Sequence, residues 1–78
     1  MTDVKMVDVT LHIDETIDTE KREGLRDAVL ACEGVMGAII QPKTPHLLLV
    51  EYDPDRVTSA NLLETVTARG VHAELVGL

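Results

Sequence analysis

Three histidines, His12, His46 and His72, are the side chains of this sequence best suited to holding a metal ion. Neutral imidazole is a common ligand of zinc and of cupric ion, and carboxylates often complete such sites. Asp14 and Glu74 each stand two residues after a histidine and can supply one. The alternatives are that the histidines are polar surface residues, or that neighbouring imidazoles act as a pH switch.

Catalytic chemistry is not indicated by the remaining residues. Cys32 is the single cysteine, which excludes an internal disulfide, and its position on a helical apolar stripe is typical of a small core residue. No serine, cysteine or lysine stands beside a base in a pattern typical of an activated nucleophile. The acidic segment after His12 has no glycine before Gly24, unlike a phosphate-binding loop. We therefore expect a protein that is not an enzyme and has no resident cofactor.

The elements that position these residues follow from hydrophobic periodicity and from capping residues. Residues 7–13 alternate apolar with polar side chains, as a strand with one buried face does. A helix follows, capped by Asp18 or Thr19 and ended by Gly34. Two strands over 35–40 and 46–52 are joined by a proline-containing turn.

The last third of the chain shows the same capping and periodicity signals. Thr58 is placed to cap a second helix, which Gly70 ends, and residues 71–76 alternate as a fourth strand. The order strand, helix, strand, strand, helix, strand predicts an α+β fold. This fold is the ferredoxin-like two-layer sandwich, an antiparallel four-stranded sheet with both helices on one face, in a single domain over residues 1–78.

Right-handed crossovers place the first and third strands at the centre of this sheet. The end of the first strand then lies beside the beginnings of the third and fourth, so the three histidines gather at one end of the molecule. His12 and His72 share the outward parity and are expected as cross-strand neighbours, with about 5 Å between their Cβ atoms. His46 has the inward parity but is the first residue of its strand, so the pattern does not determine the direction of its side chain.

The sheet face without helices is predicted to carry apolar side chains. The residues with outward parity that form this expected interaction surface are Ile39, Leu47, Leu49 and Val76. Contiguous exposed apolar residues usually mark a partner site or a contact between copies. A register shifted by one residue would instead bury them.

Nearly the whole chain resembles the heavy-metal-associated domain. The resemblance runs through "VTLHID", "EGV" and, most strongly, "YDPDRVTSANLLETVTARGVHAEL". Small copper chaperones and the amino-terminal modules of metal-pumping ATPases have this domain, which implies the ferredoxin-like fold. The family's Met-x-Cys-x-x-Cys motif aligns with Thr16, Asp18 and Lys21, so both thiolates are missing. A carboxylate beside an ammonium does not replace two soft sulfur ligands for cuprous ion.

Composition narrows the choice of partners and compartment. The formal net charge of -7, with fourteen acidic against seven basic residues, argues against nucleic acid and against an anionic membrane surface. No apolar run is long enough to span a bilayer, and no signal segment opens the chain. With a single cysteine, the expected compartment is the cytoplasm.

The sequence thus predicts a small domain similar to the heavy-metal-associated family but without its dithiol site. Its expected role is contact with a protein partner or with a second copy through the open sheet face. The alternative role is binding or trafficking of zinc or copper by His12, His46 and His72 in place of the cysteines.

Overall fold

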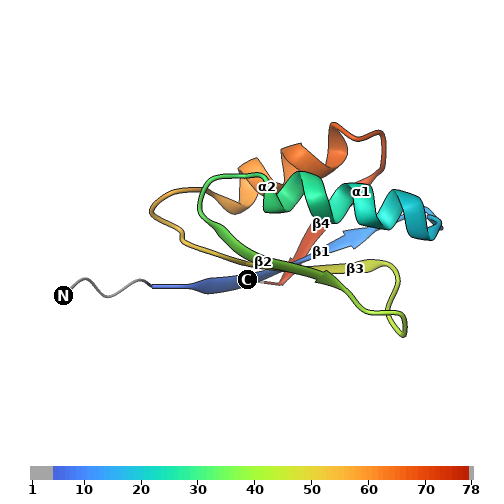
Figure 1. Cartoon of the computed structure of the whole chain (residues 1–78), viewed down its shortest axis with the longest axis horizontal. Coiled ribbons are helices and arrows are strands. Elements are labelled where there is room, and N and C mark those ends of the chain that lie inside the picture. The colour runs from blue at the N-terminus through green and yellow to red at the C-terminus, as the bar shows by residue number, and fades with distance from the viewer. Residues whose placement is uncertain (1–4, 78) are drawn as a thin grey trace.

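The computed structural model describes residues 5–77 of the chain. Its elements, in chain order, are β1 (Val7–Ile13), α1 (Thr19–Leu30), β2 (Val35–Ile40), β3 (Leu47–Tyr52), α2 (Ser59–Thr67) and β4 (Ala73–Gly77). The four strands form one antiparallel sheet in the order β2-β3-β1-β4. Figure 1 shows both helices on the same side of this sheet. The predicted ferredoxin-like α+β fold is confirmed.

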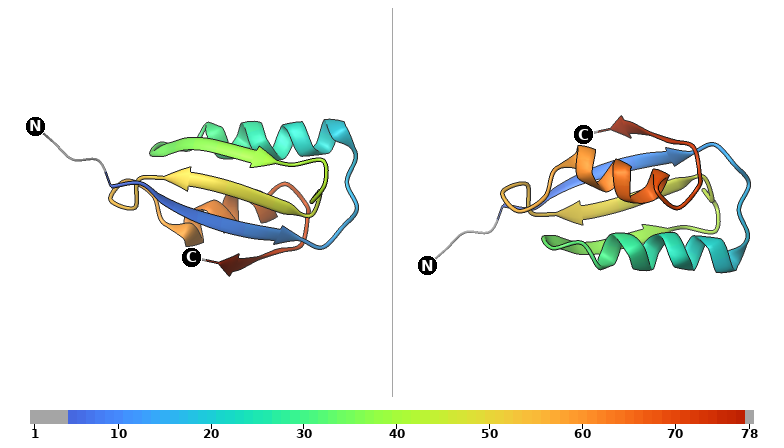
Figure 2. Two further views of the ribbon diagram at one scale, coloured as in Figure 1. Left: turned by 90° about the horizontal axis from the view of Figure 1, so that it is seen from below. Right: turned by 90° about the horizontal axis from the view of Figure 1, so that it is seen from above.

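The central position of β1 and β3 is also as predicted, and Figure 2 shows the two strands between β2 and β4. Their register pairs Leu11 with Leu48 and His12 with Leu47. Side chains of a strand point alternately to the two faces, so Leu11 and Leu48 face the helices while His12 and Leu47 face away from them. This parity decides which residues are available for function on the open face.

Both helix starts follow from local side-chain chemistry. The Asp18 carboxylate accepts a hydrogen bond from the Lys21 amide at 2.8 Å, and the Thr58 hydroxyl accepts one from the Asn61 amide at 3.1 Å. These contacts satisfy amides in the first turn that have no partner within the helix. Of the two residues expected to cap the first helix, Asp18 is the one that does so.

The first helix ends earlier than the sequence predicted. Helix α1 stops at Leu30, and Ala31 is its C-cap, so Cys32 and Gly34 belong to the turn before β2. Gly34 has a φ of 95°, and a Cβ added there would lie 2.8 Å from the Arg56 Cβ. Glycine is required by this turn, four residues beyond the helix end at Leu30.

The core lies between the sheet and the helices and is almost entirely aliphatic. It consists of fully or nearly fully buried side chains from four of the six elements, β1, α1, β3 and α2, and from the segment before β4: Val9, Leu11, Ile13, Leu25, Val29, Leu48, Val50, Tyr52, Leu62, Val66 and Val71. Cys32 is half-buried beside this cluster, 3.5 Å from the Thr65 hydroxyl, as expected of a small packing residue. No helix within residues 5–77 is long and apolar enough to cross a membrane.

Candidate functional site

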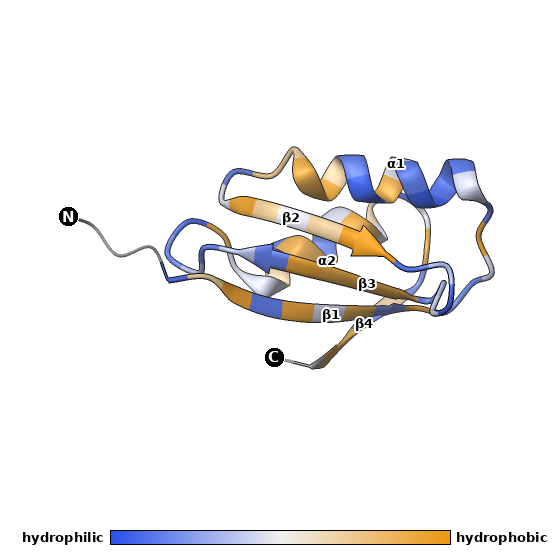
Figure 3. Cartoon of the chain, turned by 60° about the horizontal axis from the view of Figure 1, so that its bottom comes forward, coloured by the Kyte–Doolittle hydropathy of each residue, from blue (hydrophilic) through white to orange (hydrophobic). Residues whose placement is uncertain are grey.

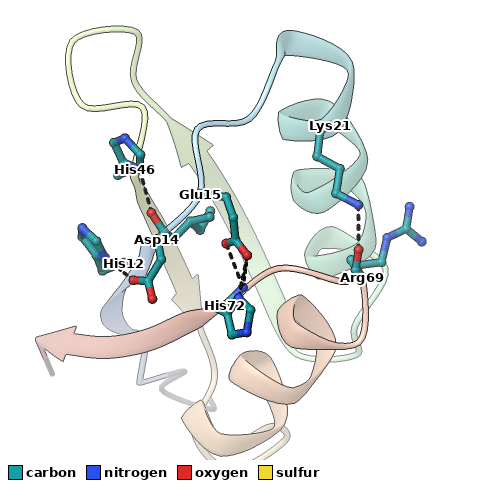
Figure 4. Close-up of polar contacts among 8 residues, drawn as sticks. His12, Asp14, Glu15, Lys21, His46, Arg69 and His72 are labelled. Carbon is teal, nitrogen blue, oxygen red and sulfur yellow. Dashed lines mark hydrogen bonds and ion pairs between the residues drawn. The ribbon is translucent and has the colours of Figure 1, made fainter.

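The three histidines lie at the end of the sheet where β1 finishes. The Ile13 amide donates to the His46 carbonyl at 2.7 Å, and the Asp14 amide donates to the His72 carbonyl at 2.9 Å. The segments before β3 and β4 are therefore tied to the last residues of β1. Figure 4 shows His12, His46 and His72 around this point, as the topology predicted.

His12 and His46 form a stacked pair. Their ring centroids are 5.8 Å apart and their planes differ by 15°. The His46 Nδ1 donates to the Ile13 carbonyl at 2.7 Å, and because a carbonyl only accepts, this contact places the proton of neutral His46 on Nδ1. Nearly parallel rings do not direct their nitrogen lone pairs toward one point, so this pair does not chelate as it stands. His46 instead covers one face of the His12 ring.

His72 is engaged elsewhere, so the predicted pairing of His12 with His72 is wrong. The cross-strand partner of His12 on β4 is Glu74, two residues further along, and His72 precedes the strand. The Glu15 carboxylate accepts from the His72 amide at 2.8 Å and contacts the His72 Nδ1 at 2.7 Å (Figure 4). Glu15 thus ties the loop after β1 to the start of β4.

This contact changes the acid–base behaviour of both groups. The hydrogen bond to the Glu15 carboxylate, followed by its charge, raises the pKa of His72 above its ordinary value. The pKa of Glu15 is lowered by the side-chain and then the backbone hydrogen bond from His72. A charge-assisted bond favours the ionised form of both partners.

Potential metal ligands converge on the other side of His12. His12, Asp14 and Glu74 each offer a ligand atom, and these atoms all lie within 4.8 Å of one another. The His12 Nδ1 and the Asp14 Oδ1 are only 3.2 Å apart (Figure 4). His12 is partly buried, whereas both carboxylates are exposed. His12 and Glu74 share one row across the open face with Leu47, the β3 partner of His12.

The residues that the sequence resemblance aligns with the family's dithiol do not suit a cuprous ion. Thr16 and Asp18 present oxygen atoms, and the Asp18 carboxylate is occupied as the cap of α1. The Lys21 ammonium donates to the Arg69 carbonyl at 2.6 Å and so connects the first turn of α1 to the segment after α2 (Figure 4). In this alignment an ammonium takes the place of the second thiolate, so these residues lack the sulfur ligands that cuprous ion prefers.

The open face exposes most of the apolar side chains that were expected there. Ile39 and Leu49 are register partners on β2 and β3 and expose 50% and 38% of their surface, while Leu47 is half-buried. Figure 3 shows this face turned toward the viewer, with hydrophobic colouring along much of β2 and β3. We call Ile39, Leu47 and Leu49 the apolar strip.

Val76 is exposed but lies apart from the apolar strip. It belongs to edge strand β4, and β1 runs between β4 and β3. The outward residues of β1 at this level, Thr10 and His12, are polar. The open face thus has two separate apolar areas instead of one continuous patch.

In the described part of the chain, the sequence pattern missed three exposed apolar residues, Val7, Leu30 and Met36, of which Met36 is the most exposed. Met36 has 67% of its surface exposed and lies where the register between β2 and β3 shifts, between Val35 and Gly37. A bulge inserts an unpaired residue and breaks the alternation of faces, so no period-two pattern can assign it. Its exposure within β2 was not indicated by any motif.

Several solved structures with the same arrangement are named as copper-binding or copper-transporting domains. A copper binding domain from HMA7, a P-type ATPase, has a TM-score of 0.82 at 17% identity, covering 90% of this chain and 93% of its own. The N-terminal domain of a potential copper-translocating P-type ATPase from Bacillus subtilis, in its Cu(I)-loaded state, gives 0.84 at 20% identity, with coverages of 94% and 90%. The yeast copper transporter domain CCC2A gives 0.81 at 21% identity, with coverages of 90% and 94%.

The resemblance to the heavy-metal-associated domain is thus confirmed at the level of the fold. No protein-family model matches the sequence, and no curated protein matches it either. At these identities the likeness establishes the architecture alone, and with one cysteine this chain has no CxxC motif.

Proposed function

We propose that this domain works by contact with another protein, including a second copy of itself, through the open face of its sheet. The proposed role is non-enzymatic and cytoplasmic. The observation that supports it most directly is the pairing of two exposed aliphatic side chains, Ile39 and Leu49, on adjacent strands of a face that neither helix covers. Side chains placed in this way lose water contact together when a flat partner surface approaches.

The size of the apolar strip limits how tightly two copies can bind. Full burial of an Ile or Leu side chain contributes about 1.5–3 kcal/mol, so covering the exposed parts of Ile39 and Leu49 adds roughly 1 kcal/mol each. A symmetric pair of copies doubles this to about 4 kcal/mol, which corresponds to a millimolar Kd before the loss of translational and rotational freedom is subtracted. Self-association through the strip alone is therefore expected to be weak, with a Kd no lower than about a millimolar, and a different partner with a larger matching surface can bind more tightly.

Sedimentation velocity at about 0.1–1 mM tests this role for self-association. The wild-type protein should show a concentration-dependent rise in sedimentation coefficient, and Leu49→Lys should abolish it because the ammonium cannot be buried without a partner. Leu30→Lys is the matched control, since Leu30 is exposed to a similar degree on α1. A wild-type protein that remains monomeric, with no concentration-dependent amide shifts in β2 and β3, would count against the self-association part.

A second candidate role is the binding and carrying of a metal ion by histidine in place of the cysteines. It is favoured by the convergence of His12, Asp14 and Glu74. The printed names of the similar structures, which include a copper binding domain and a metallochaperone, agree with such a role. Titration with zinc and with cupric ion, comparing the wild type with His12→Ala, tests it. No binding tighter than about a millimolar Kd would remove this candidate.

A further inference from the structure

We propose that His12, Asp14 and Glu74 form a three-ligand site for a borderline divalent cation of the zinc class, with a remaining coordination position open to the solvent. This inference rests on the second candidate role, and it names the ligands and the metal class. It differs from the three-histidine site predicted from the sequence, because it contains one histidine and two carboxylates.

The spacing of His12 and Asp14 already suits a metal ion. Ligand atoms held at about 2.0–2.1 Å from a tetrahedral ion lie about 3.3–3.4 Å from each other. The His12 Nδ1 and the Asp14 Oδ1 are 3.2 Å apart. A zinc ion can replace the proton shared by this pair with almost no change in the distance between the two ligand atoms.

Glu74 supplies the third ligand from a different strand. It is the register partner of His12 across β1 and β4, and its ligand atom lies within 4.8 Å of the other two. Cross-strand partners have Cβ atoms about 4.5–5.5 Å apart, so rotation of the flexible Glu74 side chain closes the remaining gap. The site thus joins the central strand to the edge strand.

His46 acts as a positioning residue for this site. Its ring stacks on His12, and its Nδ1–H bond to the Ile13 carbonyl holds it in that place. The stack restricts rotation of the His12 imidazole, which would otherwise cost entropy on binding. The near-parallel ring planes direct the His46 nitrogens away from the shared point, so His46 is not among the ligands.

Charge favours a cation at this position. Two carboxylates with one neutral imidazole give the site a formal charge of about -2, in a chain whose net charge is -7. The Lys21 ammonium is bonded to the Arg69 carbonyl, and Figure 4 draws both away from His12 and Asp14. Nitrogen with carboxylate oxygen suits zinc or cupric ion and does not suit cuprous ion, which prefers sulfur. An open coordination position allows a bound ion to be passed to another ligand.

The test is zinc binding by the reduced full chain in a Cys32→Ser background, so that the thiol does not contribute. Calorimetry should show one zinc ion per chain with a Kd below about 100 μM. His12→Gln and Glu74→Gln should each weaken binding at least about tenfold. His72→Gln is the matched control, since it removes an imidazole at the same end of the sheet and should leave the Kd within about twofold.

Amide chemical-shift changes on adding zinc provide a second measurement that does not depend on any variant. They should centre on residues 12–14 and 74, and cobalt(II) should give the visible spectrum of a four-coordinate site. Equal weakening by His72→Gln, or shift changes centred on residues 18–21, would overturn the ligand set. Zinc binding retained in Leu49→Lys separates this site from the open-face contact, so either proposal can fail without the other.

Discussion

Placing cysteines at positions 18 and 21 tests whether residues 16–21 correspond to the metal-binding loop of the heavy-metal-associated family. Asp18 is the N-cap of α1, and Lys21 is in its first turn, three residues later. Thiolates at these two positions would lie at the amino end of a helix, where the dipole favours negative charge and lowers the pKa of a thiol. We expect Asp18→Cys/Lys21→Cys, in a Cys32→Ser background, to bind Cu(I) with both new sulfurs.

The stability cost of this double change follows from two contacts. Loss of the Asp18 cap, which accepts from the Lys21 amide at 2.8 Å, costs about 1 kcal/mol. Loss of the Lys21 ammonium contact with the Arg69 carbonyl, at 2.6 Å on the surface, costs about 1 kcal/mol after allowance for solvent. The metal-free variant should unfold about 2 kcal/mol more easily, which lowers Tm by roughly 8–15 °C in a domain of this size.

Copper should more than reverse this loss. Free Cu(I) at a thousand times its Kd stabilises the folded state by about 4 kcal/mol, so the loaded variant should melt above the wild type. The assay is thermal unfolding without oxygen, with Cu(I) supplied by a coloured chelator whose loss of colour reports transfer. Asp18→Cys and Lys21→Cys alone are the controls. If the double variant binds Cu(I) no more tightly than either single variant, the alignment of residues 16–21 with the metal loop is wrong.

Three further predictions concern the folded state. The Glu15–His72 contact should stabilise the protein most between about pH 4.5 and 6.5. The His72 contribution is full below its unfolded pKa of 6.5 and is lost as pH rises through its raised folded pKa. The Glu15 contribution is full above its unfolded pKa of 4.5 and is lost as pH falls through its lowered folded pKa. Thermal melts across pH should show this maximum flattening in Glu15→Gln, because the variant removes the charge-assisted contact on which both contributions depend, and an unchanged profile would contradict the prediction. Leu11→Ala, at a fully buried position on β1, should cost about 2–5 kcal/mol in urea unfolding, against less than about 1 kcal/mol for Leu30→Ala on the surface of α1. Gly34→Ala should destabilise the protein more than Gly70→Ala. Both positions have a positive φ, but only at Gly34 would the new Cβ lie 2.8 Å from the Arg56 Cβ. Equal losses of unfolding free energy in urea would show that the turn adjusts to the added Cβ without strain.

The sequence by itself determined the fold class, because its signals act over a few residues. Alternation over residues 7–13 correctly specifies Val9, Leu11 and Ile13 as buried, whereas Val7, at the start of β1, is exposed. Asp18 and Thr58 start the helices by bonding amides three residues ahead. These effects need no knowledge of the rest of the chain. The end of α1 was predicted less well: the sequence indicated a stop at Gly34, whereas the helix ends at Leu30. The last residue of a helix depends on the segments that pack against it as well as on local sequence.

The candidate metal site was decided only by the tertiary structure. Pairing His12 with His72 or with Glu74 differs by two residues, and a shift of two keeps every side chain on the same face of the sheet. The hydrophobic pattern therefore cannot choose between them. The choice depends on the register shift near Thr10 and on Glu15, which holds His72 outside the strand. Contacts between segments some sixty residues apart form only when the whole chain packs, and they made His12 a neighbour of Glu74.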